Sequence, residues 1–271
     1  MAIKYFIYEF WVFGIKQAYA CLFGGFLLLV MIVTKYWYPL ESLHRYDFIF
    51  LAAIVFQVLL LVTKLETLKE SVVIVIFHVV ATIMELFKTS DTIGSWSYPE
   101  AYVFGIGNVP LFTGFMYSAV GSYITRAWRI FEFKYEHYPE KILTLVLVLL
   151  IYLNFFTHHF IWDFRWVLLG VTSMLFFKTQ IYFKVWRQYR HMPLLAGWLL
   201  VALFIWLAEN VGTYTSTWVY PNQTDEWQMV SLSKLVSWYL LMLLSFVLVS
   251  LVNRVQISAQ SEKVNHEPIS K

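Results

Sequence analysis

The sequence predicts an all-α membrane protein, a polytopic bundle of about eight transmembrane helices. Of its 271 residues, 60% are hydrophobic, 20% are aromatic and only 14% are charged. The mean hydropathy is +0.64. Soluble chains carry about 25% charged residues, which coat their surfaces. Because this chain is too poor in charge to coat two globular domains, its composition excludes a soluble enzyme.

Eight segments have the length of about 20 mainly apolar residues with which a helix crosses a bilayer. They are residues 17–38, 48–63, 71–88, 109–128, 142–160, 164–183, 194–212 and 230–252. The second is short, and only a few residues around Trp162 separate the fifth from the sixth, so seven or nine spans remain alternatives. Residues 1–16 are aromatic and partly amphipathic, which indicates a lead-in at the membrane interface. The polar tail, residues 255–271, is expected to be disordered.

The basic residues predict the orientation of these spans. With the N-terminus inside the cell, most Lys and Arg residues fall on the cytoplasmic side, as the positive-inside rule requires. We therefore expect a multi-pass protein of the cell membrane with both termini in the cytoplasm. The net charge of +3 is small and dispersed along the chain. It indicates the lipid bilayer as a partner and excludes nucleic acid.

The residues that bind metals are too few and too poorly spaced for a metal centre. Cys21 is the single cysteine, which excludes an internal disulfide and the multi-cysteine metal motifs. His78, His158 and His159 do not repeat the His-x-x-x-His spacing of helical metal sites. The sequence predicts neither a metal nor a cofactor.

A four-residue pattern, Trp-x-Tyr-Pro, occurs twice, beginning at Trp96 and at Trp218. A glutamate precedes each copy, Glu85 in the first case and Glu209 in the second. Two copies of a pattern made of Trp, Tyr and Pro are not expected by chance, so they indicate an internal duplication.

The duplication divides the chain into two four-helix halves, residues 17–130 and residues 141–254. An offset of four spans preserves direction, so the halves are expected to be parallel repeats related by an axis along the membrane normal. Tyr117 and Tyr239 follow their motif tyrosines at the same interval. In each half an acidic residue would then stand before an outer loop rich in Trp and Tyr.

Glu85 is the central candidate for chemistry in the first half. It shares one face of the third span with His78, because residues at intervals of three and four align on a helix. A charge in the middle of a span costs about 2.5–3.5 kcal/mol, so Glu85 should face protein or water. One interpretation is an ion pair with Lys88, three residues on. The other is a site that also contains Glu209, which has no basic neighbour on its own helix.

On the second interpretation, Glu85 and Glu209 are the catalytic residues, with His78 and Lys88 as weaker candidates. Lys234 is a candidate partner for Glu209 or for the Asp225/Glu226 pair, and a simple interfacial lysine is the alternative. The expected substrate-binding residues are Trp96, Tyr98, Asn210, Tyr214, Trp218 and Tyr220. Aromatic faces at these positions suit a membrane-interface belt or the wall around a cation. Small residues at Gly114, Ser118, Ser122 and Thr125 indicate close helix packing in the fourth span.

Two short stretches carry a family resemblance. They are Glu209-Asn210-Val-Gly212-Thr-Tyr214-Thr-Ser-Thr-Trp218-Val-Tyr220-Pro221-Asn222 and Gly107-Asn108-Val-Pro110-Leu. They resemble a bacterial family of integral membrane proteins known only as a domain of unknown function, over nearly the whole chain. More remotely, a membrane Glu followed by Gly, Tyr and x-Val-Pro-Leu is similar to the carotenoid hydratase and heterodimeric-type lycopene cyclase families. That similarity implies carboxylate chemistry on isoprenoid double bonds, although the paired Glu-Glu of the cyclases is absent from the sequence.

Three functions follow as hypotheses. The first is an enzyme with an intramembrane site for an apolar, lipid-like substrate, in which one glutamic acid protonates an alkene and the other acts as base. The second is a small proton-coupled transporter, with Glu85, Lys88 and His78 as the relay. The third is a non-catalytic membrane sensor or scaffold. The residues leave the substrate and the oligomeric state open.

Overall fold

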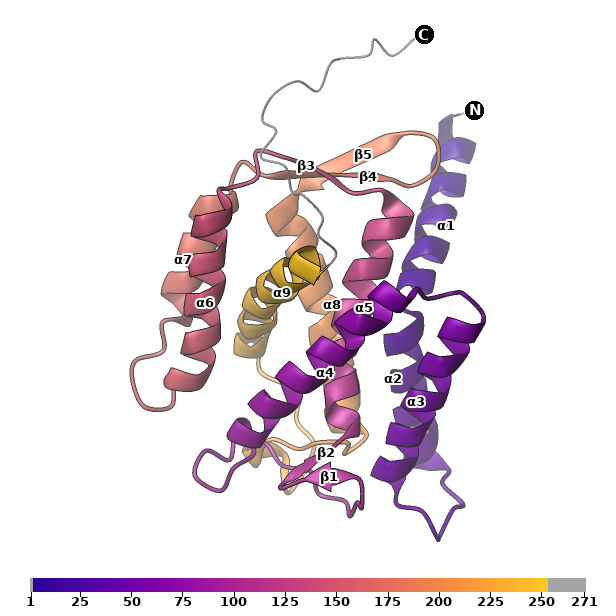
Figure 1. The fold of residues 1–271 in the computed structure, drawn as a ribbon, viewed down its shortest axis with the longest axis vertical. Helices are drawn as coiled ribbons and strands as arrows, with labels where there is room; N and C mark the ends of the chain where they lie inside the picture. The colour runs from indigo at the N-terminus through magenta and orange to yellow at the C-terminus, as the bar shows by residue number, and fades with distance from the viewer. Residues whose placement is uncertain (1, 253–271) are drawn as a thin grey trace.

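The structure, a computed structural model, describes residues 2–252 and is mainly helical, which confirms the predicted class (Figure 1). Within this part of the chain the α-helices are α1 (Ala2–Ala20), α2 (Leu22–Tyr36), α3 (Arg45–Val62), α4 (Leu68–Lys88), α5 (Phe112–Phe131), α6 (Lys141–Thr157), α7 (Arg165–Phe176), α8 (Leu194–Tyr214) and α9 (Leu232–Val252). The strands are β1 (Gly105–Ile106), β2 (Val109–Pro110), β3 (Lys134–Glu136), β4 (Gln180–Lys184) and β5 (Tyr189–Pro193), and a 3-10 turn covers Pro221–Gln223. The predicted tail, residues 255–271, lies outside the described residues.

Helix α5 is the centre of the bundle, in contact with α1, α2, α3, α4 and α9. Its small residues pack against α4, as the sequence predicts. The Ser118 hydroxyl donates a hydrogen bond to the Ile74 carbonyl at 2.8 Å. A Cβ atom at Gly114 would lie 2.4 Å from Nδ1 of His78, so only glycine allows this approach.

Four helices of the described chain are long and apolar enough to cross a membrane, namely α3, α4, α8 and α9. Helices α1 and α2 together qualify as a fifth span, bent by 71°. The predicted number of about eight spans is not confirmed. Helix α5 falls short in hydropathy because other helices surround it, and its polar residues Ser118, Ser122 and Arg126 are buried in protein.

The sixth predicted span, residues 164–183, is wrong in its second half. Helix α7 has 12 residues, or about 18 Å at 1.5 Å per residue, against a hydrocarbon core of about 30 Å. The chain then turns into β4, where Ile181 and Phe183 are buried and their neighbours are half-buried. This alternation is the pattern of a strand, and β4 pairs with β3 and β5 in an antiparallel sheet.

The first predicted span, residues 17–38, is divided between two helices. The interfacial lead-in that was expected over residues 1–16 is helical where described, as part of α1, and the helix axis breaks at Cys21. Cys21 is exposed and free.

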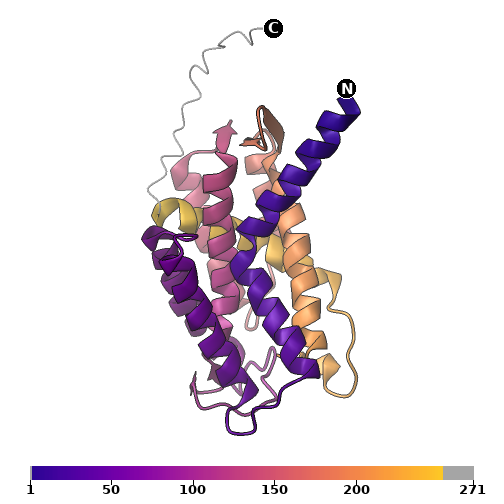
Figure 2. The same cartoon turned by 90° about the vertical axis from the view of Figure 1, so that its right-hand side faces the viewer.

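The two ends of the bundle differ in structure (Figures 1 and 2). The three-stranded sheet and the start of α1 lie at one end, and the β1–β2 hairpin lies at the other. The loops that contain the two Trp-x-Tyr-Pro motifs also lie at the hairpin end. Both candidate glutamates lie near the ends of helices that lead into these loops.

Candidate functional site

The two Trp-x-Tyr-Pro motifs pair directly with each other. Ser97 and Val219, the variable residues of the two motifs, form an isolated antiparallel bridge. Each backbone N–H donates to the other residue's carbonyl at 3.0 Å. Because equivalent residues pair, the bridge brings Trp96 and Tyr98 beside Trp218 and Tyr220.

The start of α3 holds both loops in place. The Asp47 carboxylate accepts hydrogen bonds from the backbone N–H groups of Val103 and Phe104, at 2.8 to 3.1 Å. The Arg45 guanidinium donates to the Thr215 carbonyl and to the Thr217 hydroxyl, each at 3.1 Å. These bonds fix two segments that are far apart in the sequence against one helix end.

Glu85 is buried, with 1% of its surface exposed, and three aromatic side chains donate to it. Oε2 accepts from Trp96 Nε1 at 2.8 Å and from the Tyr98 hydroxyl at 2.6 Å. Oε1 accepts from the Tyr117 hydroxyl at 2.8 Å. Three donors on one carboxyl group favour its ionised form, whereas burial disfavours it. The first motif and α5 together therefore build a binding shell around Glu85.

Glu209 is 4% exposed and has a similar but smaller shell. Oε1 accepts from the Tyr220 hydroxyl, the tyrosine of the second motif. Oε2 accepts from Trp238 Nε1 at 2.7 Å. The tyrosine expected to match Tyr117, Tyr239, is buried in the apolar core instead, so the neighbouring Trp238 supplies the donor.

Both motif tyrosines keep their protons. Burial, and then the charge of the adjacent glutamate, raises the pKa of Tyr98 and of Tyr220 well above the usual value for tyrosine. Both phenols therefore remain hydrogen-bond donors at neutral pH.

Lys234 lies between the two glutamate shells. Its Nζ is 4.2 Å from the ring centre of Tyr220 and 5.5 Å from that of Trp96. These two rings contact each other edge to face at 6.2 Å. One ring donates to Glu85 and the other to Glu209, so Lys234 stacks on a donor of each carboxylate. The predicted direct pairing with Glu209 is absent among the described ion pairs.

The predicted ion pair between Glu85 and Lys88 is also wrong. Lys88 is 2% exposed and its Nζ lies 2.8 Å from Nε2 of His159. It also lies 4.6 Å from the ring centre of Phe155. Because the shell of aromatic donors occupies both oxygens of Glu85, the lysine turns to the end of α6.

Three of the expected site residues lie away from this arrangement. His78 packs against Phe115, with ring centres 4.6 Å apart, and its buried Nδ1 has no hydrogen-bond partner. Asn210 ties the end of α8 to the Val230 backbone N–H at 2.9 Å. The exposed Tyr214 contacts the hydroxyl of Tyr36 at 3.2 Å. The structure does not join His78 to Glu85, as a proton relay through these residues would require.

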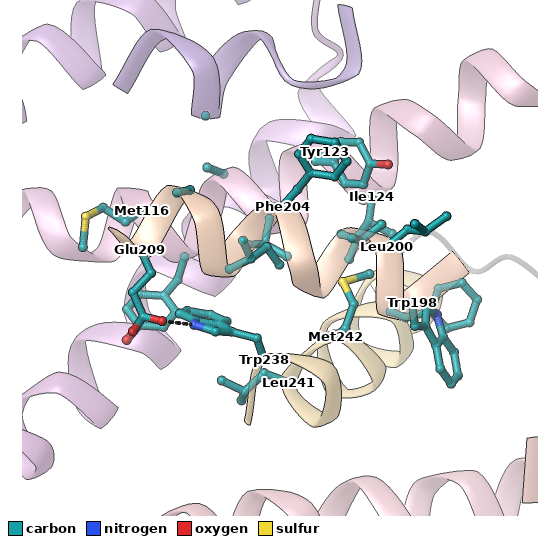
Figure 3. Close-up of a pocket in the computed structure, with 18 of the residues that line it drawn as sticks. Met116, Tyr123, Ile124, Trp198, Leu200, Phe204, Glu209, Trp238, Leu241 and Met242 are labelled. Carbon is teal, nitrogen blue, oxygen red and sulfur yellow. Dashed lines mark hydrogen bonds between the residues drawn. The ribbon is translucent and has the colours of Figure 1, made fainter. Parts of the chain in front are cut away.

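A cavity of about 890 Å³ connects the site to the interior of the bundle. Both glutamates, both motifs and Lys234 line it, and most of its remaining walls are apolar side chains from α1, α2, α5, α8 and α9. Figure 3 shows the hydrogen-bonded pair Glu209 and Trp238 at one end and Trp198 at the other, with Leu200 and Phe204 between them along α8.

The sequence reasoning missed three residues that line this cavity, Trp238, His158 and Arg165. Trp238 precedes the expected Tyr239 by one residue, so the repeat pointed to the correct turn of α9. His158 was considered for a site only as a metal ligand, and no motif drew attention to Arg165. No local pattern indicates that the turn between α6 and α7 folds against the end of α4.

Among the described residues, no group of three or more His, Cys, Asp or Glu side chains is arranged to hold a metal. What the site does contain is a pair of buried carboxylates with aromatic donors and a lysine between them, at one end of an elongated apolar cavity. This arrangement suits proton transfer and the binding of a long apolar molecule.

Comparison with known proteins gives one family and one curated relative. A family model described as "Protein of unknown function (DUF817)" matches residues 9–246. The "Uncharacterized protein YoaT" of Bacillus subtilis (strain 168) is 38% identical over 258 residues, which cover 95% of this chain and 97% of that protein. No solved structure matches the chain.

Proposed function

This chain belongs to the DUF817 family of proteins of unknown function, and we propose from its site that it acts on an elongated, apolar or amphipathic molecule inside the membrane. The observation that supports this proposal is that two buried carboxylates from different helices line one mostly apolar cavity. At about 890 Å³ the cavity falls within the range of about 300–1,000 Å³ that is typical of ligand sites.

The two carboxyl groups have environments that suit different roles. Glu85 accepts three hydrogen bonds, which suits a standing carboxylate that acts as base or stabilises a cation. Glu209 accepts two and is the proposed acid. A proton would move from the Glu209 carboxyl to an alkene carbon, and the Glu85 carboxylate would stabilise the cation, because Lys234 already occupies the faces of Trp96 and Tyr220. Loss of a proton to Glu85 completes an isomerisation. In a hydration, water adds to the cation and gives up one proton to Glu85, and in both cases a proton returns from Glu85 to Glu209 before the next turnover.

An isoprenoid is the substrate class that the short motif resemblance to the carotenoid hydratase and lycopene cyclase families indicates. Its chain of double bonds supplies the alkene for this chemistry. Its extended chain suits a cavity that is lined by residues of the motif loops and also by Phe183 and Met192 at the sheet end of the bundle.

The test compares extracted lipids and pigments from cells that lack the protein with those from cells complemented by wild type or by variants. Glu209→Gln and Glu85→Gln keep the size of the side chain and remove the carboxyl group. We expect each to abolish the lipid species that depends on wild type while membrane insertion is unchanged. Glu226→Gln, at an exposed loop carboxylate, is the matched control and should retain it. Full activity in the Glu85→Gln, Glu209→Gln double variant contradicts the proposal.

A transporter is the second candidate, because the same cavity reaches residues at both ends of the bundle. Uptake that changes with the protein while the extracted lipids stay the same would favour transport over chemistry. His78 has no place in this version, since it neither lines the cavity nor contacts Glu85.

A further inference from the structure

We propose that the cavity takes a long-chain amphiphile with an anionic headgroup, a phosphate or a carboxylate, and that Lys88, Lys234 and Arg165 bind the headgroup. This inference rests on the proposed function, which holds that a ligand enters this cavity. What is new is that the ligand carries a negative charge. Three basic side chains from three helices, α4, α7 and α9, line the same end of the cavity.

Within residues 2–252, two of these three cations lack a carboxylate partner. Among the residues that the structure describes, no carboxylate oxygen lies within ion-pair distance of Lys88 or Lys234. Lys88 is held by His159 and the Phe155 ring, and Lys234 by two aromatic rings. The nearby glutamate oxygens are occupied by Trp and Tyr donors. Neither lysine forms a direct ion pair within the described residues, so an anionic group that contacts both would add charge-assisted hydrogen bonds at this end of the cavity.

Arg165 is partly engaged and completes the cluster. Its guanidinium forms an ion pair with Asp163 at 3.0 Å and donates to the Ser233 carbonyl at 3.2 Å. A guanidinium carries five N–H donors, so these contacts leave donors for a headgroup. The bond to Ser233 also holds the start of α9, and so Lys234, against the start of α7.

Burial and the nearby positive charges both lower the pKa values of the two histidines in the α6–α7 turn. Burial, and then the charge of Lys88, lowers the pKa of His159 to about 4. Burial also lowers the pKa of His158, with the charges of Lys88 and Arg165 adding to the effect, while the Asn154 carbonyl and Asp163 oppose it. Both histidines are therefore neutral at pH 7, and their surroundings disfavour a further cation.

The rest of the cavity suits the hydrocarbon part of such a ligand. Beyond the basic cluster the walls are side chains such as Leu200, Phe204, Leu241 and Met242 (Figure 3). A chain anchored by its headgroup at Lys88 and Lys234 would therefore extend along α8, past both glutamates.

The experiment measures binding to the purified full-length protein in a neutral detergent, through the fluorescence of the tryptophans that line the cavity. The probes are hexadecyl phosphate, hexadecanoate and hexadecanol, which share one chain and differ in headgroup. We expect the phosphate and carboxylate probes to bind at least about tenfold more tightly than the alcohol, because a hydrogen bond to a charged group contributes about 1.5–3 kcal/mol. The tighter of the two anions identifies the headgroup class.

Charge removal tests the assigned residues. Lys88→Met and Lys234→Met should each weaken hexadecyl phosphate binding by about tenfold or more and leave hexadecanol binding unchanged. Lys141→Met removes the same charge at an exposed position at the start of α6 and should have no effect. Lys88→Arg and Lys234→Arg keep the charge and should retain hexadecyl phosphate binding. They provide the second measurement where a methionine variant does not fold.

Equal affinity for the alcohol and the two anions would overturn the proposal, as would undiminished phosphate binding in the Lys88→Met, Lys234→Met double variant. Binding is measured without turnover, so the test also separates this inference from the proposed chemistry. The Glu85→Gln, Glu209→Gln protein should still bind hexadecyl phosphate, whether or not those glutamates prove catalytic.

Discussion

Gly212 shows how a single residue without a side chain shapes the site. A Cβ atom at this position would lie 1.9 Å from Cη2 of Trp218, so the indole ring of the second motif rests directly on the backbone of α8. Gly212 lies three residues after Glu209, in the last turn of the helix. The close approach therefore couples the position of the motif to that of the glutamate.

We predict that Gly212→Ala lowers the free energy of unfolding by about 1–3 kcal/mol, because the added methyl group displaces the Trp218 ring. Thermal unfolding in detergent measures the loss. Gly170→Ala is the matched control, since nothing lies within 4 Å of a Cβ atom at that helical glycine. It should be neutral or stabilising by up to about 1 kcal/mol. Equal stability of the two variants would show that the ring does not pack on Gly212.

The contacts of Lys88 show how far a sequence spacing can mislead at this scale. A glutamate and a lysine three residues apart on a helix usually interact, and Glu85 and Lys88 have this spacing. In the folded chain Glu85 is saturated by Trp96, Tyr98 and Tyr117. The groups that displace Lys88 from Glu85 come from a loop and from α5. Residue spacing within one helix carries no information about them.

At the scale of elements, α4 and α5 are joined at both ends by different chemistry. At the site end the link is the hydrogen bond from Tyr117 to Glu85. At the sheet end Arg126 of α5 forms a buried ion pair with Glu66, which lies in the turn just before α4. The two groups are 3.0 Å apart and both side chains are 0% exposed. Burial raises the pKa of the Glu66 carboxyl, although the charge of Arg126 opposes the rise.

We predict that Arg126→Met lowers the free energy of unfolding by about 3–5 kcal/mol, because it leaves a buried carboxylate without its partner. The Arg126→Met, Glu66→Leu double variant removes both charges and should recover most of that loss. Chemical denaturation of the purified protein measures both values. If the double variant is as unstable as the single one, the cost comes from lost packing around the arginine and not from the unpaired carboxylate.

The segment that contains α7 and β4 shows where hydropathy alone predicts the wrong secondary structure. Residues 164–183 have the length of a span, yet α7 ends at Phe176. Beyond the helix end, the Thr179 hydroxyl donates a hydrogen bond to the His137 carbonyl at 2.9 Å. Strand β4 then finds its hydrogen-bond partners on β3 and β5. The pairing of β4 with β3 joins residues some 40 positions apart, such as Gln180 and Glu136. Hydropathy averaged over a short window of sequence does not detect such a contact.

At the scale of the whole molecule, the connections that the sequence predicts on opposite sides of the membrane lie at opposite ends of the bundle. The start of α1 and the three-stranded sheet share one end, and the motif loops lie at the other (Figure 1). The predicted cytoplasmic connections, after Arg129 and around Arg190, fall at the sheet end.

We predict that reporters fused after Arg129 and after Arg190 are cytoplasmic, and that reporters within residues 89–108 and 213–229 are external. The physical reason is the excess of Lys and Arg on the first set of connections. Alkaline phosphatase and green fluorescent protein fusions, which are active on opposite sides of the membrane, measure this. External reporters after Arg129 would contradict the predicted orientation and would place the motif loops on the cytoplasmic side.

We also propose that the two halves arose by duplication. The antiparallel bridge between the equivalent residues Ser97 and Val219 supports this, because a pairing of equivalent positions has local two-fold symmetry. The helix contacts correspond as well. Helix α5 contacts α2, α3 and α4, and α9 contacts α6, α7 and α8. Each half would then contribute one glutamate, one motif and one central helix to the common cavity.

The sequence by itself determined the class of the protein and most helix positions, and it singled out both glutamates as candidates. Residues 71–88 and 194–212 were expected as spans, and α4 and α8 cover Leu68–Lys88 and Leu194–Tyr214. Apolar length is a local property, so it can be read along the chain. The repeated motif identified Glu85 and Glu209 for a similar reason, since a recurrence is visible without a fold.

Only the tertiary structure decided how these residues meet. It decided that Trp238 and not Tyr239 donates to Glu209, that Lys88 contacts His159, and that the turn around His158 and Arg165 borders the cavity. Each of these facts depends on packing between segments far apart in the sequence. Such packing is decided by the shapes and hydrogen-bonding groups that the folded chain brings together, and no local pattern in the sequence records them.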